Sequence, residues 1–140
     1  MVIPCYNHAA YVRQCIESVI AQDYDCIELI IIDDGSTDDS VAVIESLLPA
    51  CRERVVRFEF RSRPNKGLAA TLNEALHWAE GEYFSALASD DVLLPGKTSR
   101  LLSEITDEPE VAGVFGGCEY IDADGRLIGS EYHPLAYFSF

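Results

Sequence analysis

The segment Glu28–Asp38, with the sequence ELIIIDDGSTD, decides the fold that the rest of the chain is expected to follow. A row of apolar residues, Leu29 to Ile32, runs directly into Asp33 and Asp34. Apolar residues at every position, rather than at every second one, are typical of a strand covered on both faces, as in a parallel sheet flanked by helices. The two carboxylates then follow the carboxyl end of the strand, where open α/β sheets bind ligands. A solvated acidic turn that caps the next helix is an equally good interpretation of this segment alone.

Composition and charge limit the class of protein. The chain has 140 residues, 49% of them apolar, so we expect one domain with a packed core over residues 1–140. The formal net charge of −14 argues against a nucleic-acid partner and fits a site for cations, or for an anion bridged by a metal. Five scattered cysteines without a Cys-x-x-Cys pair indicate reduced thiols in a cytoplasmic protein. No apolar run reaches the ~20 residues of a membrane span.

The spacing of apolar residues predicts strands that alternate with helices. Strands are expected at 2–3, 27–32, 55–60, 83–88 and 111–115, followed by a hairpin over 120–128. Helices are expected at 10–22, 39–48, 67–81 and 95–105. Pro49 is expected to stop the second helix, and the third is expected to bury one face, namely Leu68, Leu72, Ala75, Leu76 and Ala79. This alternation indicates βαβ units with right-handed crossovers and a mainly parallel sheet.

Polar residues follow three of the expected strands. They are Tyr6–Asn7 after the first, Asp33–Asp34 after the second and Asp90–Asp91 after the fourth. Parallel strands bring these loops to one edge of the sheet, where four carboxylates would repel one another unless a cation bridges them. Carboxylate oxygens favour Mg²⁺ or Mn²⁺, and such ions commonly bind substrate phosphates. Two acidic pairs at equivalent strand ends therefore predict a metal–phosphate site.

The other candidate residues have plainer interpretations. The sequence contains neither G-x-G-x-x-G nor G-x-x-x-x-G-K-[ST], so phosphate charge would be met by the metal and by Arg63 or Lys66, which equally fit a solvated loop. Tyr6 could stack on a base or simply pack half-buried. Four aromatic residues are interpreted as structural, namely His8, His77, His133 and Trp78.

Five pieces of sequence occur in order over residues 2–105. They are Val2–Asn7, Glu28–Asp38, Asn65–Gly67 with Asn73, Gly81–Tyr83, and Ala88–Asp91 with Pro95. Together they resemble the nucleotide-binding half of the family 2 glycosyltransferases. The resemblance implies an α/β domain with the GT-A (Rossmann-like) fold, truncated at the acceptor half and belonging to a longer protein. It further implies a metal-dependent, inverting enzyme that transfers sugar from a nucleotide-diphosphate sugar, commonly a UDP-sugar. The acceptor would be a hydroxyl on a glycan or lipid-linked acceptor in polysaccharide or cell-envelope glycan synthesis.

The resemblance also implies roles for single residues. Tyr6 would stack on the base, Asp34 would accept a hydrogen bond from its ring N–H, and Asp33 would support that loop. Asp90 would lie near the ribose or the metal, and Asp91 near the Mn²⁺ or Mg²⁺ that bridges the diphosphate. The remaining nucleotide-binding residues that it implies are Pro4, Asn7, Lys66 and Gly67.

Two positions depart from the family's pattern, since many members have Asp where Ala88 stands and Arg where Leu72 stands. The Ser-Asp-Asp form at 89–91 is similar to that of the spore-coat polysaccharide synthesis type within the family. The family's catalytic base is expected beyond Phe140, because nothing matches Asp122 or Asp124 to it.

Two other functions stay open at this stage. A receiver-like phosphoryl-transfer domain also holds Mg²⁺ with carboxylates at strand ends, but its acidic pair follows the first strand, where this chain has Pro4–Asn7. A non-catalytic module that binds a nucleotide sugar fits a chain without an acceptor half. In each case we expect a cytoplasmic location, at most peripheral to the inner face of the membrane.

Overall fold

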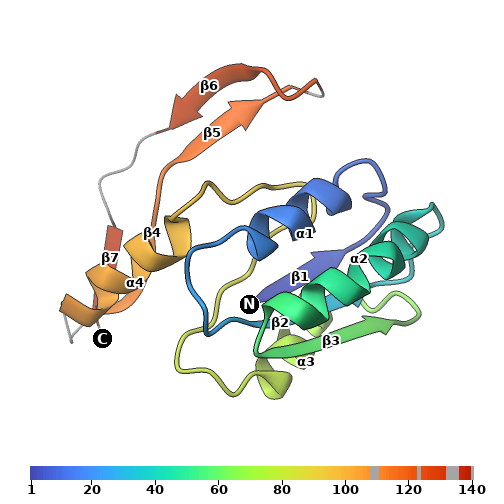
Figure 1. The fold of residues 1–140 in the computed structure, drawn as a ribbon, viewed down its shortest axis with the longest axis horizontal. Coiled ribbons are helices and arrows are strands. Elements are labelled where there is room, and N and C mark those ends of the chain that lie inside the picture. Colours follow the sequence, from blue (N-terminus) through green and yellow to red (C-terminus); the bar gives the residue numbers. More distant parts are fainter. Residues whose placement is uncertain (108–110, 123, 132–135, 140) are drawn as a thin grey trace. The chain divides into compact units, whose positions relative to one another are not determined.

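The computed structural model describes residues 1–107, 111–122, 124–131 and 136–139. The chain divides into two compact units, Met1–Pro95 and Gly96–Phe140, and each is described by itself. The first unit contains β1 (Val2–Cys5), α1 (Val12–Ile20), β2 (Glu28–Asp33), α2 (Ser40–Arg54), β3 (Arg57–Ser62) and α3 (Leu68–Trp78) (Figure 1). The second contains α4 (Lys97–Asp107), β4 (Val111–Phe115), β5 (Cys118–Ile121), β6 (Leu127–Glu131) and β7 (Ala136–Ser139).

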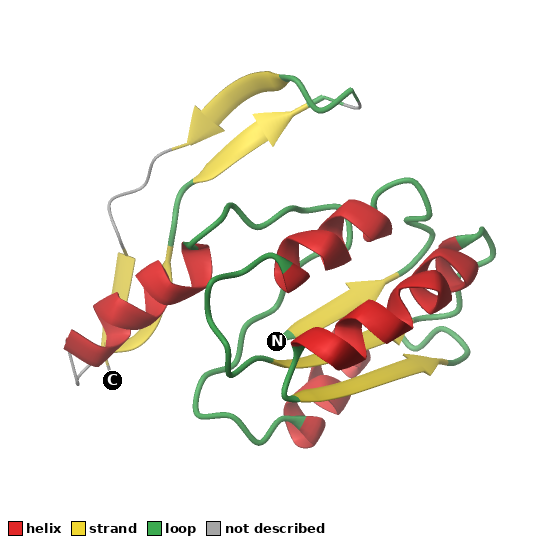
Figure 2. Ribbon diagram, viewed as in Figure 1, coloured by secondary structure: helices red, strands yellow, loops and turns green. Residues whose placement is uncertain are grey.

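The first unit is built on a parallel sheet with the strand order β1-β2-β3. The segment that predicted the fold supplies the middle strand, and its residues Leu29 to Ile32 are buried, as expected for a strand covered on both faces. Figure 2 shows the helices on the two sides of these strands. The prediction of an α/β fold with a parallel sheet flanked by helices is confirmed.

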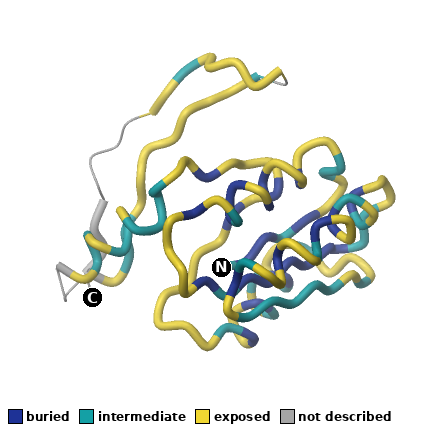
Figure 3. The backbone as a smooth tube through the Cα atoms, viewed as in Figure 1, coloured by how far each residue is buried: buried dark blue, intermediate teal, exposed yellow. Residues whose placement is uncertain are grey.

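Alternate residues of the strands build two separate cores. Ile3, Leu29 and Ile31 pack with the buried faces of α1 and α2 in the larger core. Val2, Ile30 and Ile32, on the opposite face, pack with Ala75 and Trp78 of α3. Figure 3 shows the buried backbone concentrated along these strands. Because helices pack on both faces of the sheet, the carboxyl ends of β1 and β2 are held in fixed positions.

The second helix does not stop at Pro49, as the sequence predicted. α2 continues to Arg54 with Pro49 on its exposed side, because Cys51, one turn further, extends the buried face of Ile44 and Leu47. The Arg54 side chain then donates hydrogen bonds to the carbonyls of Ile20, Gln22 and Tyr24 at the end of α1. Burial and these bonds outweigh the hydrogen bond that a proline removes. The longer helix moves the start of β3 from the expected residue 55 to Arg57.

The expected strand over 83–88 is reduced to one isolated parallel bridge between Val2 and Ala86. Val2 N–H donates to the Ser85 carbonyl at 2.8 Å, and Leu87 N–H donates to the Val2 carbonyl at 3.0 Å. The segment therefore runs beside β1, on the side away from β2. Residues 81–86 are exposed, and of the expected strand only Leu87 is buried, in the larger core.

The buried face of α3 agrees with the prediction only in part. Ala75 is buried and Leu72 packs against the smaller core, as predicted, but Leu68 and Leu76 are exposed. Thr71 and Trp78 are buried in addition. The prediction grouped the leucines by helical spacing. In the structure the face that packs on the sheet is the one that carries the bulky indole ring of Trp78. Trp78 is structural, as interpreted from the sequence: its ring packs in the smaller core and beneath the Arg57 guanidinium, 4.2 Å from the ring centroid.

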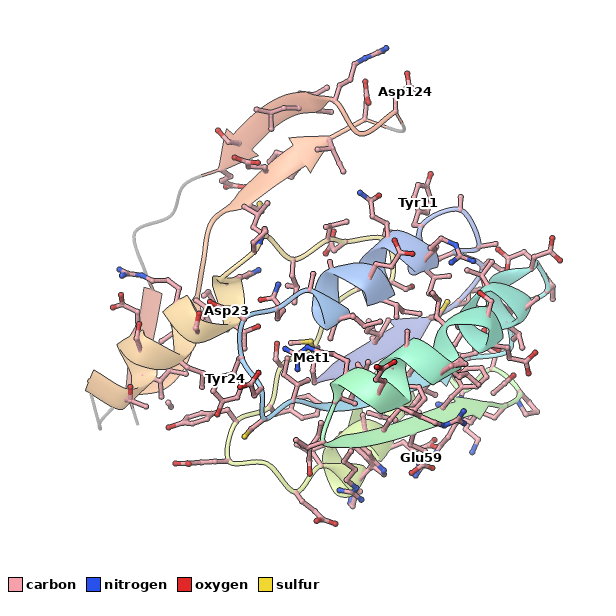
Figure 4. All side chains as sticks on the ribbon, in the orientation of Figure 1. Met1, Tyr11, Asp23, Tyr24, Glu59 and Asp124 are labelled. Atoms are coloured by element: carbon pink, nitrogen blue, oxygen red, sulfur yellow. The ribbon has the colours of Figure 1, made fainter. Side chains whose placement is uncertain are left out.

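The second unit contains two antiparallel pairs, β4 with β7 and β5 with β6. The hairpin predicted over 120–128 is present as β5–β6, and Figure 4 shows Asp124 in its turn. The Asp122 carboxylate accepts backbone hydrogen bonds from Asp124 and Arg126, both at 2.9 Å, and so holds this turn. Within the described residues, no helix is both long enough and apolar enough to cross a membrane.

Candidate functional site

The order in which the strands are added to the sheet reverses its direction at β1. The chain builds β1, β2 and β3 outward to one side and then returns to the other side of β1 at Ala86. In open α/β sheets such a switch point is where ligands bind, just outside the carboxyl ends of the strands. The loops that follow β1, β2 and the bridge at Ala86 all carry residues predicted for the site.

The loop after β1 is fixed against the loop after β2. Asn7 N–H donates to Ser36 Oγ at 2.8 Å, and Asn7 Oδ1 accepts from Thr37 N–H at 2.8 Å. Asn7 adopts a positive φ of 56°, which asparagine tolerates better than most residues. Pro4 lies within β1 opposite Ile32, and Tyr6, two residues further, is 49% exposed. The geometry thus presents one aromatic ring on a fixed backbone.

Asp33 is completely buried at the end of β2. Its carboxylate accepts a hydrogen bond from Ser62 Oγ at 3.0 Å and longer ones from Ser36 N–H at 3.3 and 3.4 Å. Asp33 therefore joins the end of β3 to the turn that contains Gly35. These contacts hold the loop and leave Asp33 without access to a ligand.

Asp34, only 5% exposed, is surrounded by donors from the loop after β3. Its Oδ1 accepts from Lys66 N–H at 2.8 Å and from the Arg63 guanidinium, and its Oδ2 accepts from Gly67 N–H at 2.9 Å. Burial raises the pKa of Asp34, but these hydrogen bonds and the Arg63 charge outweigh burial and hold the pKa below its ordinary value. Asp34 is therefore a charged acceptor at neutral pH.

Gly35 and Gly67 make this arrangement possible. Gly35 has φ +81°, and a Cβ there would lie 2.8 Å from Asn65 N and 3.2 Å from the Arg63 carbonyl. Only a residue without a side chain lets the two loops approach so closely. Gly67, with φ +86°, turns its N–H toward Asp34 as α3 begins. Lys66 and Gly67 contribute backbone N–H groups here, whereas the sequence drew attention to the Lys66 side chain.

Asp90 and Asp91 lie in the loop after the bridge at Ala86, and both are exposed. Ser89, buried just before them, hydrogen-bonds with His8 Nδ1 at 2.7 Å, and this nitrogen lies 3.8 Å from Asp90 Oδ1. Burial, reinforced by the charges of Asp91 and Asp90, raises the pKa of Cys15 to about 12, so the Cys15 thiol stays protonated. His8, interpreted as structural from the sequence, joins the loop after β1 to the acidic loop.

The crowding of four carboxylates that the sequence suggested is not found. Asp33 is bonded to serine and backbone donors, and Asp34 is neutralised by Arg63. Across the described part of the chain, no group of three or more His, Cys, Asp or Glu residues is placed to hold a metal ion. Arg63 is 12% exposed, so its charge serves this internal pair and does not face a phosphate. Two exposed carboxylates, Asp90 and Asp91, remain on the other side of β1.

The fold and these loops define an α/β domain of the doubly wound kind, with its polar residues gathered around a switch point. A family model, "Glycosyl transferase family 2", matches residues 1–138, and the chain belongs to this family. It is 35% identical over 135 residues to a chondroitin synthase of Escherichia coli and 34% identical over 131 residues to a hyaluronan synthase of Pasteurella multocida. These matches cover 96% and 94% of the chain but 19% and 13% of the two relatives.

Solved structures with similar folds include a protein bound to UDP and a mannosyltransferase. Staphylococcus aureus TarS (residues 1–349) in complex with UDP superposes with a TM-score of 0.67 and 25% identity, over 77% of this chain and 32% of that one. A mannosyltransferase of Pyrobaculum calidifontis, solved with GDP-mannose and Mn²⁺, reaches a TM-score of 0.70 at 21% identity, over 85% of this chain and 34% of that one, which supports the fold alone. The narrower similarity to the spore-coat type gains no support from these relatives.

Proposed function

We propose that this chain forms the donor-binding part of a metal-dependent, inverting glycosyltransferase. It would bind a UDP-sugar and serve the transfer of the sugar to an acceptor hydroxyl in polysaccharide or cell-envelope glycan synthesis. The observation that carries this proposal is the separation of two chemical environments across β1. Asp34, a buried carboxylate paired with Arg63, lies on one side of β1, and the exposed carboxylates Asp90 and Asp91 lie on the other.

The comparisons support the choice of donor. S. aureus TarS (residues 1–349), 27% identical over 76% of this chain with a TM-score of 0.63, was solved with UDP-GlcNAc. The chondroitin and hyaluronan synthases indicate polysaccharide synthesis as the setting. Membership of glycosyltransferase family 2 leaves little support for a receiver-like phosphoryl-transfer domain, and Tyr6–Asn7 takes the position of the receiver's acidic pair.

The base and the diphosphate would use different residues. Tyr6 offers an exposed ring for stacking, and Asp34 offers a charged acceptor for a ring N–H, with Asp33 and Asn7 holding the loops that carry them. Pro4, Lys66 and Gly67 would also take part in nucleotide binding, and the backbone N–H groups of Lys66 and Gly67 would do so by holding Asp34.

Asp90 and Asp91 fit a divalent cation by the chemistry of their donors. Mg²⁺ and Mn²⁺ take oxygen ligands, and ions of this kind are usually held by one or two carboxylates together with water and substrate phosphates. A pair of exposed carboxylates is sufficient for such a site, although they form no closed cage. When bound, the cation stabilises negative charge on the departing diphosphate. Asp91 would hold it, and Asp90 would lie near the ribose or the cation.

Calorimetric titration of the chain with UDP and UDP-GlcNAc, first with Mn²⁺ and then with excess chelator, tests this proposal. We expect binding with Mn²⁺ and a loss of at least about tenfold in affinity with chelator, because the exposed acidic pair then repels the diphosphate. Absence of UDP binding under both conditions would overturn the proposed donor. Equal affinity in both would overturn the metal bridge while leaving a nucleotide-binding module.

A further inference from the structure

Arg63 has contacts that the nucleotide-binding role of its loop does not require. Its guanidinium donates to Asp34 Oδ1, to Glu74 Oε2 at 2.9 Å and to Thr71 Oγ1 at 2.8 Å. Thr71 is completely buried and also donates to the Gly67 carbonyl at 3.1 Å. One planar side chain thus fixes the residue after β2, the first turn of α3 and a glutamate one turn further along that helix.

These contacts restrict what Asp34 can do. An ionised carboxylate offers about four acceptor positions. Arg63 and Lys66 N–H use two on Oδ1, and Gly67 N–H uses one on Oδ2. Among the described residues, one position on Oδ2 is therefore left for a further donor. Since the carboxylate is held from both sides, it cannot rotate to present another atom.

We propose that Arg63 is a positioning residue that sets the base preference of this site, by holding Asp34 as a fixed acceptor for a base with a ring N–H. This inference rests on the proposed function, in which Asp34 faces the base. Uracil carries a hydrogen at N3, whereas N3 of cytosine is an acceptor, which a fixed carboxylate repels. The class of nucleotide selected is therefore one with a ring N–H donor, and cytidine nucleotides are rejected.

Arg61 provides a matched control for Arg63. It donates to Glu74 Oε1 at 2.8 Å, the other oxygen of the carboxylate that Arg63 contacts, and to Glu59 at 2.6 Å. Both arginines thus join β3 or its following loop to α3 through Glu74, but only Arg63 contacts Asp34. Arg61→Gln and Arg63→Gln should weaken the same attachment of α3, and only Arg63→Gln releases the acceptor.

The experiment measures Kd for UDP, CDP and pyrophosphate, all with Mn²⁺, for the wild type and four variants. The variants are Arg61→Gln, Arg63→Gln, Arg63→Lys and the neutral pair Asp34→Asn/Arg63→Gln. We expect Arg63→Gln to weaken UDP by about tenfold, to lower the preference for UDP over CDP by a similar factor, and to leave pyrophosphate within about twofold. Arg63→Lys should recover part of the UDP affinity, because a single ammonium cannot replace the planar set of donors. Arg61→Gln should retain the wild-type preference.

The outcomes separate this inference from the proposed function. If the wild type binds no UDP, the proposed function fails and this inference fails with it. If the wild type binds UDP and Arg63→Gln keeps the wild-type preference for UDP over CDP, only the role of Arg63 is overturned. Should Arg63→Gln fail to fold, Arg63→Lys gives the measurement, because it keeps Asp34 and a positive charge beside it but loses the planar set of donors. A full wild-type preference for UDP over CDP in Arg63→Lys would then overturn the inference, and the double variant shows the preference that remains once Asp34 itself is removed.

Discussion

Two of the Asp-Asp pairs in the chain, 33–34 and 90–91, lie on either side of β1, and their surroundings are opposite. Asp33 is fully buried and Asp34 is 5% exposed, whereas the Asp90 side chain is 49% exposed. Hydroxyl, backbone N–H and guanidinium donors bind the first pair. The same dipeptide therefore acts as part of the framework at one strand end and as a solvent-facing pair of charges at the other.

The difference comes from the strands that precede the two pairs. β2 lies in the middle of the sheet, so β3 and α3 supply partners for Asp33 and Asp34. The segment before Asp90 touches the sheet through one bridge at its edge. A carboxylate in the middle of a sheet must be neutralised by neighbours, because burying an unpaired charge is costly. At the edge of the sheet an exposed carboxylate can be solvated by water, and a ligand can take the place of that water.

The largest expected effect separates the two pairs by stability. Asp34→Ala leaves two backbone N–H groups without their acceptor and removes one of the two carboxylates that pair with Arg63, so we expect a loss of about 3–5 kcal/mol in the free energy of unfolding. Asp91→Ala, at an exposed position, should cost under about 0.5 kcal/mol. Urea unfolding followed by circular dichroism measures both. Equal losses would show that the two pairs do not differ as described.

A second test concerns the close approach of the loops after β2 and β3. Asparagine tolerates positive φ, so Gly35→Asn removes most of the backbone cost and isolates the collision of the new Cβ with Asn65 N. We expect a loss of about 1–3 kcal/mol in unfolding free energy. The control is Gly125→Asn, because Gly125 has φ +77° and open space around it. If Gly35→Asn and Gly125→Asn lost the same unfolding free energy, the close approach of the two loops would not contribute to stability.

A third and smaller effect concerns the exposed pair in ligand binding. Asp91→Asn should remove most of the Mn²⁺ dependence of UDP binding, about tenfold in Kd or ~1.4 kcal/mol, because a charged oxygen ligand is lost. Asp25→Asn is the matched control, since Asp25 is also exposed but precedes β2, at the opposite end of the strands. Calorimetry with Mn²⁺ and with chelator provides the comparison. If Asp25→Asn reduced the metal dependence as much, the effect would come from net charge alone.

The smallest expected effect is in the pH dependence of stability. The pKa of Asp34 is lower in the folded state than its ordinary value near ~3.9, so ionisation favours the folded state. This contribution is fully present above the unfolded pKa and is lost as the pH falls through the folded pKa. The difference in unfolding free energy between wild type and Asp34→Asn should stay constant from pH 7 to about 5 and shrink below about 4. A difference that grows on acidification would mean that the pKa is raised.

The sequence predicted the sheet because its strongest signal lay in the middle strand. The uninterrupted row Leu29 to Ile32 requires cover on both faces, which leaves few alternatives to a helix-flanked parallel sheet. The predicted ends of α1 and α4 also lie within two residues of the observed ones. Pro49 misled the prediction, because a proline on the exposed side of a helix costs less than the buried contacts of Cys51 contribute.

The partners of the site residues could not be predicted equally well. Asp34 and Arg63 are 29 residues apart, and nothing local links them. The register of β2 and β3, which sets Asp33 opposite Ser62, places residues 34 and 63 side by side. A register cannot be read from apolar spacing alone, so the sequence counted Asp34 among four repelling carboxylates. For the same reason it treated Arg63 as a candidate for phosphate.

The isolated bridge at Ala86 has a consequence for local opening. Two backbone hydrogen bonds, both with Val2, and the buried Leu87 side chain attach residues 85–87 to the first unit, so separating this segment breaks fewer contacts than unfolding β1 to β3. The Leu87 amide should then exchange its hydrogen with solvent faster than the amides of β2. Since the same segment leads into Ser89 and Asp90, a ligand bound there would slow that exchange. Ordering this edge of the sheet would cost free energy on binding and so would lower the observed affinity for the ligand.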